Sequence, residues 1–215
     1  MYKSRVLRTW LAKKYLFPLF KELGFKPEQL VIFRVGFAML TGFSILFLNH
    51  PYSMALLTIY QFVFLLDYID GDLAKHYKNF SLKWNLFDRT AHYLISAFFL
   101  FVITASYSFR TQNDLFLNIG IGGSIFLILA MIVEYKWVIE GDRNSLDGLR
   151  DTPDKMGILS PVYTFLQIDG SFTFFYFFVI LDLIPLTIIF FTTIHLLIFL
   201  KKLFILKIKW QMKKK

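Results

Sequence analysis

Long apolar runs alternate with short polar stretches along this chain, and each run is about as long as a membrane-spanning helix. Four such runs cover residues 30–48, 54–70, 86–105 and 115–133. A helix of roughly 20 apolar residues crosses the hydrocarbon core of a bilayer, so each run predicts one span. The pattern therefore indicates an all-α, polytopic membrane protein.

The second half of the chain is less regular. A polar insert at residues 134–157 precedes another apolar stretch, which is long enough for two spans near 158–181 and 186–204. Asp169 and Gly170 interrupt the first of these, and an interfacial helix is the alternative there. We favour a bundle of six spans.

Basic residues lie next to the apolar runs. Residues 1–28 mix lysine and arginine with large apolar residues, which predicts an amphipathic helix in the membrane interface. A single transmembrane domain at 29–206 and a basic tail at 207–215 follow. With six spans, these basic segments share one side of the membrane with a basic loop, and the positive-inside rule makes that side cytoplasmic. The loop contains Lys75, Lys78 and Lys83.

Composition narrows the class of protein further. The 215 residues are 56% hydrophobic and include 27 Phe, which is too apolar for an ordinary soluble domain. There is no cysteine, so disulfides and thiolate metal sites are excluded. In so apolar a chain, the net charge of +9 indicates anionic lipid headgroups as partners rather than nucleic acid. The richness in Lys, Phe and Ile favours a bacterial inner membrane as the location.

Acidic residues gather where the second apolar run ends and the third begins. A charge beside hydrocarbon costs several kcal/mol unless it is paired, so carboxylates there indicate a cation or a reaction. Asp88 and His92 are spaced i, i+4 and share a helix face. The preceding helix carries a second set at i, i+3, i+4 and i+7, namely Asp67, Asp70, Gly71 and Ala74.

A tight connection between these two helices would bring three carboxylates and the His92 imidazole around one point. Such a group suits one or two divalent cations, because oxygen ligands favour Mg²⁺ and a histidine shifts the preference toward Mn²⁺ or Zn²⁺. Gly71 and Ala74 remove bulk from the same face, which allows a large ligand to approach. Lys75 offers a positive charge to a phosphate.

Each of these features also has an interpretation without chemistry. Asp67 and Asp70 would then cap a helix end at the water boundary. Lys75 would be a lysine whose ammonium group reaches the interface, and His92 a hydrogen-bonded interfacial histidine. Arg34, near the start of the first span, would anchor that span at the interface.

The acidic motif resembles the signature of the CDP-alcohol phosphotransferases, D-x2-D-G-x2-A-R-x8-G-x3-D-x3-D. No insertion or deletion is needed across its 26 positions. Three positions differ in residue type: Lys75 stands for Arg, Trp84 for the second Gly and His92 for the last Asp. The matching positions are Asp67, Asp70, Gly71, Ala74 and Asp88. Upstream, Pro27 and Arg34 fit the P-N-x-[IL]-T-x-x-R pattern with which members often open their first span, although its Asn and Thr are missing.

The resemblance implies a reaction and a set of partners. An alcohol attacks the β-phosphorus of a CDP-linked donor, such as CDP-diacylglycerol, and CMP leaves. Mg²⁺ or Mn²⁺ is the implied cofactor, and its implied ligands are Asp67, Asp70 and Asp88. The last acid of the motif is the general base, so His92 inherits that role or a place among the metal ligands. The family also forms homodimers through its membrane helices.

The donor would lie against the remaining motif positions, Gly71, Ala74, Lys75 and Trp84. An indole in place of glycine either fills the nucleotide's space or stacks on the cytosine, and both alternatives stay open at this point. The acceptor alcohol is open too.

Two other functions compete with this one. The first is a catalytically silent relative that binds metal or nucleotide as a partner subunit, which the residues at positions 84 and 92 would favour. The second is a divalent-cation transporter. A transporter typically places its acids near the bilayer midplane, whereas these lie at one membrane face.

Overall fold

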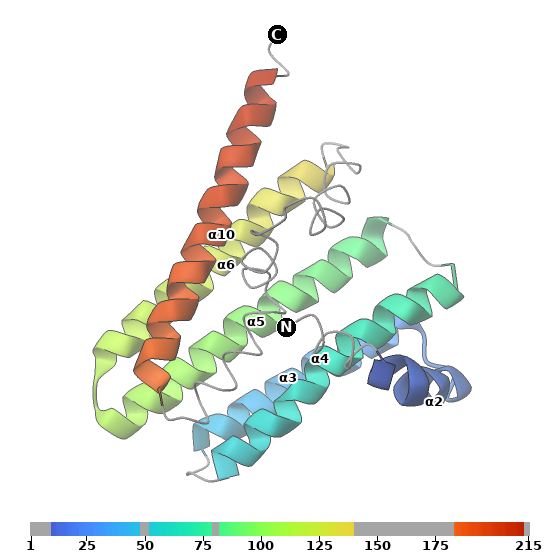
Figure 1. The fold of residues 1–215 in the computed structure, drawn as a ribbon, viewed down its shortest axis with the longest axis horizontal. Coiled ribbons are helices and arrows are strands. Elements are labelled where there is room, and N and C mark those ends of the chain that lie inside the picture. The colour runs from blue at the N-terminus through green and yellow to red at the C-terminus, as the bar shows by residue number, and fades with distance from the viewer. Residues whose placement is uncertain (1–9, 48–51, 79–81, 140–182, 213–215) are drawn as a thin grey trace. The chain divides into compact units, whose positions relative to one another are not determined.

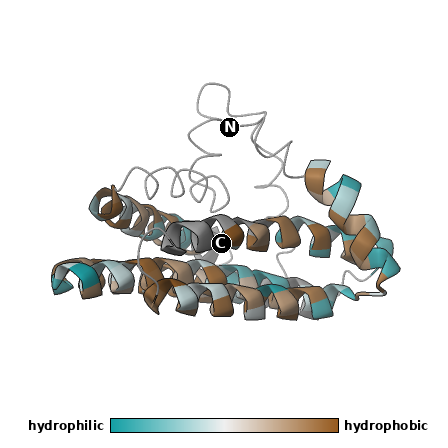
Figure 2. Cartoon of the chain, turned by 90° about the horizontal axis from the view of Figure 1, so that it is seen from below, coloured by the Kyte–Doolittle hydropathy of each residue, from teal (hydrophilic) through white to brown (hydrophobic). Residues whose placement is uncertain are grey.

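A computed structural model describes residues 10–47, 52–78, 82–139 and 183–212. Within these ranges the chain is almost entirely helical and forms no strand, which confirms the predicted all-α class. Four of the described helices are long and apolar enough to cross a membrane, over Pro27–Phe47, Leu86–Thr111, Asp114–Lys136 and Ile184–Phe204. Hydrophobic residues accordingly colour most of the length of the helices in Figure 2.

The count of six spans stays a prediction. The predicted span at 158–181 and the interfacial alternative within it lie outside the described residues. The chain falls into two compact units, Met1–Ser106 and Tyr107–Lys215. The predicted division at residues 28 and 206 is not tested by these units.

The first unit consists of a short helical segment followed by three long helices (Figure 1). The α3 and α4 helices form an antiparallel pair, and α5 packs against both, because Tyr60 of α4 stacks on Phe99 of α5 with 4.2 Å between ring centroids. The Tyr60 hydroxyl also donates to the Ile95 carbonyl at 3.2 Å. The elements are η1 (Ala12–Leu16), α2 (Phe17–Glu22), α3 (Pro27–Phe47), α4 (Tyr52–His76) and α5 (Leu82–Thr111), whose last residues fall in the second unit.

The predicted amphipathic helix at 1–28 ends earlier than predicted, and residues 1–9 lie outside the described part of the chain. Gly24 has a φ of +70°, a conformation that glycine adopts without strain, and it ends the helical segment. Buried Ala12 and Phe20 pack this segment against α3 and α4. Its other face exposes a set of large apolar side chains, Trp10, Tyr15, Leu19 and Leu23. A place in the membrane interface stays a prediction for this face.

Local signals fix where α3 begins, and with it the register of every residue on that helix. Pro27 is its first residue, where the missing N–H and the fixed φ of proline are favourable. The Lys26 amide donates to Gln29 Oε1 at 2.9 Å, the reciprocal half of a capping box. Seven positions along, this register directs Arg34 into the interior, where it is only 1% exposed.

The helix α3 also runs parallel to α5, and glycine permits their close approach. A Cβ built on Gly42 would collide with the ring of Phe98. The same ring packs edge-on against Phe43 with centroids 5.2 Å apart. The hydrogen atom at Gly42 is therefore a packing requirement between these two helices.

The second unit pairs α6 (Asp114–Ile139) with α10 (Ile184–Met212). Thr192 Oγ1 donates to the Ile119 carbonyl at 3.1 Å, and buried His195 lies with Nδ1 3.1 Å from the Gly123 carbonyl. Both residue numbers rise together along the pair, so the two helices run parallel (Figure 1).

The polar insert was predicted to begin at residue 134, and this boundary is wrong. The helix α6 continues to Ile139, and Glu134 lies buried within it. Lys202 of α10 forms an ion pair with Glu134, which allows a carboxylate to remain inside a helical contact. Residues 140–157 of the predicted insert lie outside the described part of the chain.

Candidate metal centre

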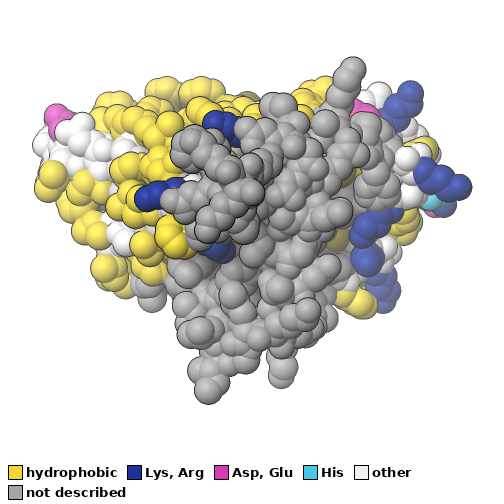
Figure 3. Space-filling view, turned by 90° about the horizontal axis from the view of Figure 1, so that it is seen from above, with side chains coloured by type: hydrophobic (Ala, Val, Ile, Leu, Met, Phe, Trp, Pro, Cys, Tyr) yellow, Lys and Arg dark blue, Asp and Glu magenta, His cyan; other side chains and the backbone are white. Residues whose placement is uncertain are grey.

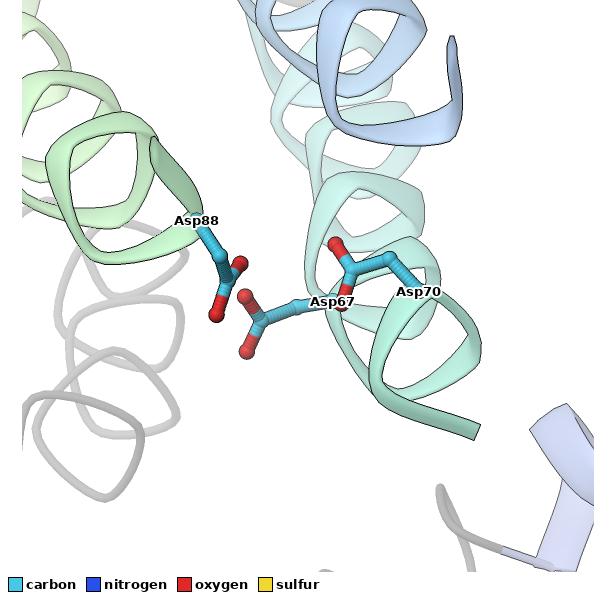
Figure 4. A group of neighbouring side chains, drawn as sticks. All are labelled: Asp67, Asp70 and Asp88. Carbon is cyan, nitrogen blue, oxygen red and sulfur yellow. The ribbon is translucent and has the colours of Figure 1, made fainter. Parts of the chain in front are cut away.

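Three carboxylates from two helices meet at one end of the first unit. Asp67 and Asp70 lie one turn apart on α4, and Asp88 faces them from α5 (Figure 4). Each offers one oxygen such that the three atoms lie within 4.8 Å of one another. The meeting follows from helical spacing on α4 together with the antiparallel packing of α5, as the sequence predicted.

The guanidinium of Arg34, on α3, lies among these carboxylates. Its Nη1 pairs with Asp67 Oδ1 and, at 2.7 Å, with Asp70 Oδ2. Its Nη2 reaches Asp88 Oδ1 at 3.0 Å. One side chain thus connects all three helices at the site, and the interpretation of Arg34 as an interfacial anchor is wrong.

Burial divides the site into an inner and an outer side. Arg34 and Asp70 are each 1% exposed, whereas Asp67 and Asp88 are each 22% exposed. With all three carboxylates ionised, the guanidinium leaves the cluster a formal charge of −2. A net charge of that size beside apolar helices favours binding of a cation from the outer side.

The chemistry of the donor set fits one divalent cation. Carboxylate oxygens are the ligands that Mg²⁺ and Mn²⁺ prefer, and the net charge of the cluster is equal and opposite to that of such an ion. The metal-ligand role of Asp67, Asp70 and Asp88 stays a prediction.

His92 lies at the edge of the cluster, one turn after Asp88 on α5. Its Nδ1 is 3.4 Å from Asp67 Oδ1, and the side chain is 21% exposed. The predicted juxtaposition of this imidazole with the carboxylates is therefore present in the structure.

The four residues predicted to contact the donor have different environments. A Cβ at Gly71 would meet nothing within 4 Å, so helix packing does not demand a glycine there. Ala74 is fully buried, and Trp84 is 8% exposed, one turn before Asp88 on α5. Lys75 is 68% exposed and lies 3.5 Å from Asp72, not on the carboxylate cluster. Their roles in ligand binding stay predictions.

Lysines surround this end of the first unit. In Figure 3, several Lys and Arg side chains lie together at one edge of the view, and others lie among hydrophobic side chains elsewhere. The Phe17 ring of α2 packs edge-on against His76 near the end of α4, with centroids 6.1 Å apart, so α2 lies against the last turns of α4. The exposed lysines of these elements are Lys13, Lys14, Lys21, Lys75 and Lys78.

Sequence reasoning placed the acids but missed the partner that holds them. The available signal was the position of Arg34 inside the first apolar run, where an unpaired charge is costly. That signal shows that Arg34 needs an anion, but the anion lies more than 30 positions along the chain.

Comparison of the chain with models of known protein families, with curated proteins and with solved structures finds no match.

Proposed function

We propose that the chain is a membrane-embedded transferase of the CDP-alcohol phosphotransferase type. It moves a substituted phosphoryl group, which we take to be phosphatidyl, from a CDP-alcohol to an acceptor alcohol and releases CMP. The observation that carries this proposal is the cluster of Asp67, Asp70 and Asp88. These residues have the spacing of the family motif, and their carboxylates meet within 4.8 Å at the ends of apolar helices.

The cluster supplies what a pyrophosphate donor requires. Asp67, Asp70 and Asp88 would hold Mg²⁺ or Mn²⁺, which screens the pyrophosphate and stabilises the charge that develops on the departing CMP. Arg34 keeps the three carboxylates oriented through the contacts described above. The open space beside Gly71 lets the donor approach α4 next to the carboxylates.

His92 is placed to accept the proton that the reaction releases. In the tautomer that directs Nδ1–H at Asp67 Oδ1, 3.4 Å away, the lone pair of Nε2 would take the proton of the acceptor hydroxyl. The acceptor oxygen then forms its bond to the β-phosphorus, and the bond from that phosphorus to CMP breaks. A neutral imidazole performs this step near pH 7 more readily than a carboxylate of ordinary pKa.

The location of the site suits a lipid donor and a polar acceptor. Apolar helices give the donor a path from the bilayer, and the lysines around α2 and the end of α4 attract anionic headgroups. The same lysines support the positive-inside assignment, which puts this end and both termini in the cytoplasm of a bacterial cell. A homodimer is the assembly that we propose by analogy with the family.

The test is release of CMP by the purified protein. The assay contains CDP-diacylglycerol, Mg²⁺ or Mn²⁺, and pooled acceptor alcohols, and it compares wild type with Asp88→Ala. We expect metal-dependent release that Asp88→Ala lacks while remaining folded, because this residue is partly exposed at a helix end. Asp114→Asn is the matched control, since that carboxylate binds Ser108 in the second unit, and it should keep full activity. Full activity in Asp88→Ala would refute the metal-site assignment.

A silent relative is the second candidate, and one observation favours it. Trp84 is buried one turn from Asp88, where the family motif has glycine, so the indole is placed to reduce the nucleotide's space. This candidate predicts binding of CDP without release of CMP. Metal flux into proteoliposomes in the absence of nucleotide would instead favour a cation transporter.

A further inference from the structure

We infer that Arg34 is a resident cation of the carboxylate cluster and that it leaves the site room for one divalent cation rather than two. The inference rests on the proposed function only in taking Asp67, Asp70 and Asp88 as the metal ligands. It assigns to α3 a residue that sets how many ions the site holds and how tightly.

The contacts of Arg34 give it the place of a bridging ion. Its two terminal nitrogens bind three oxygens, which come from three different carboxylates on two helices. A cation that bridges two metal-ligand carboxylates occupies the same kind of position. Arg34 thus engages one oxygen of each of the three carboxylates.

The charge of the cluster also indicates one divalent cation rather than two. The fourth acidic position of the motif holds His92, so the cluster contains three carboxylates rather than four. When all three carboxylates are ionised, the formal charge of the cluster with Arg34 is −2, which one divalent cation neutralises. A second would make the cluster +2 around a guanidinium that is 1% exposed. Arginine stays protonated at every accessible pH, so the cluster cannot relieve that excess by losing a proton from Arg34.

Burial indicates where the ion enters. Asp70 and Arg34 form the inner side of the cluster, whereas Asp67 and Asp88 are partly open to solvent. The ion is therefore held mainly between Asp67 and Asp88, whose carboxylates face each other from α4 and α5 in Figure 4. The guanidinium lies behind it and repels it.

The first experiment counts ions on the nucleotide-free wild-type protein. Equilibrium dialysis with Mn²⁺, together with electron paramagnetic resonance of the bound ion, should give one Mn²⁺ per chain with the spectrum of an isolated ion. Two Mn²⁺ per chain with an exchange-coupled spectrum would overturn the inference, and so would no binding at all. Asp67→Asn with Asp88→Asn should remove the bound ion, and retention would place the ion elsewhere and overturn the inference too.

The second experiment changes the resident charge. Arg34→Gln removes the repelling charge, so its Mn²⁺ dissociation constant should fall at least about tenfold. Arg34→Lys keeps the charge but not the fork of the guanidinium, so its dissociation constant should not fall below that of wild type. Weaker binding by Arg34→Gln would mean that Arg34 acts only by holding the ligands, and it would overturn the inference. If Arg34→Gln fails to fold, the wild-type ion count and Arg34→Lys still decide.

These readouts separate the inference from the proposed function. One Mn²⁺ per chain without CMP release would preserve the inference and remove the transferase. Release of CMP with two coupled Mn²⁺ ions would preserve the transferase and overturn the inference of a single ion.

Discussion

Replacing Arg34 by methionine tests whether the carboxylate cluster depends on its buried cation. Methionine keeps an unbranched apolar stem of similar length, and the change removes only the charged fork. Three carboxylates within 4.8 Å are then left without a counter-charge, and one of them is 1% exposed. Removing one partner of a buried ion pair typically costs about 3–5 kcal/mol. We expect a loss in the free energy of unfolding at the upper end of that range, because three partners are affected together.

A matched control lies on the same unit of the chain. Lys75 pairs with Asp72 at 3.5 Å, but its side chain is 68% exposed. Exposed pairs contribute about 0–1 kcal/mol, so Lys75→Met should change stability little. Both variants lose one positive charge and gain the same side chain, and they differ mainly in burial.

Thermal unfolding in detergent micelles without divalent cations measures the difference. For a chain of this length, 1 kcal/mol shifts Tm by about 2–4 °C, so Arg34→Met should lower Tm by roughly 10–20 °C and Lys75→Met by no more than about 4 °C. Excess Mn²⁺ should recover part of the loss, because at 100 times its dissociation constant a ligand stabilises the folded state by about 2.7 kcal/mol. Equal shifts in the two variants would refute the reasoning, since burial of the pair would then have no consequence.

Three further changes test other contacts. Gly42→Ala should destabilise the protein by about 1–3 kcal/mol through overpacking between α3 and α5. At Gly36 a Cβ meets nothing within 4 Å, so Gly36→Ala should be neutral or stabilising by up to about 1 kcal/mol. Thermal unfolding compares the two variants, and equal effects would contradict the close approach of α3 and α5. Lys202→Met should cost about 3–5 kcal/mol by leaving buried Glu134 without its partner, and adding Glu134→Gln should restore part of that loss in a double-mutant cycle, so additive losses would argue against the pair. His92→Asp should lower the pH optimum of CMP release, because a carboxylate of ordinary pKa replaces the imidazole as the base; an unchanged pH profile would argue against that role for His92.

Helical periodicity was enough to predict the acidic half of the site. The i, i+3 spacing of Asp67 and Asp70 puts both on one face of α4, and a short connection to α5 leaves Asp88 opposite them. These spacings lie within one helix or between successive helices, so the hydrophobic periodicity of the sequence is enough to predict them. Their convergence required no knowledge of how α3 packs.

Contacts between distant segments were the part that sequence reasoning could not supply. The partners of Arg34 follow more than 30 positions later, and Lys202 meets Glu134 across 68 positions. Arg34 was interpreted from its own neighbourhood as an anchor, and Glu134 as part of a polar insert. Pairing changed both interpretations, because a charge that finds an opposite charge can lie inside a helix contact where it would otherwise be excluded.

The short helical segment before α3 shows a third kind of limit. Its basic and apolar composition predicted one amphipathic helix, but the turn at Gly24 depends on backbone hydrogen bonds that composition does not describe. The Gly24 and Phe25 amides donate to the Lys21 and Phe20 carbonyls, both at 3.0 Å, a pattern typical of a glycine-terminated helix. A glycine followed closely by Pro27 was the signal for this stop.

The parallel course of α6 and α10 has a consequence for how the second unit is oriented. When two parallel helices both cross a bilayer, their C-terminal ends reach the same leaflet. Lys136 lies near the C-terminal end of α6, and Lys207 near that of α10, so both lysines meet one set of headgroups. Because the positive-inside rule places lysines on the cytoplasmic side, the lysines of these two helices favour the same orientation of the second unit in the membrane. A sequence change that reversed one of them would have to reverse the other as well.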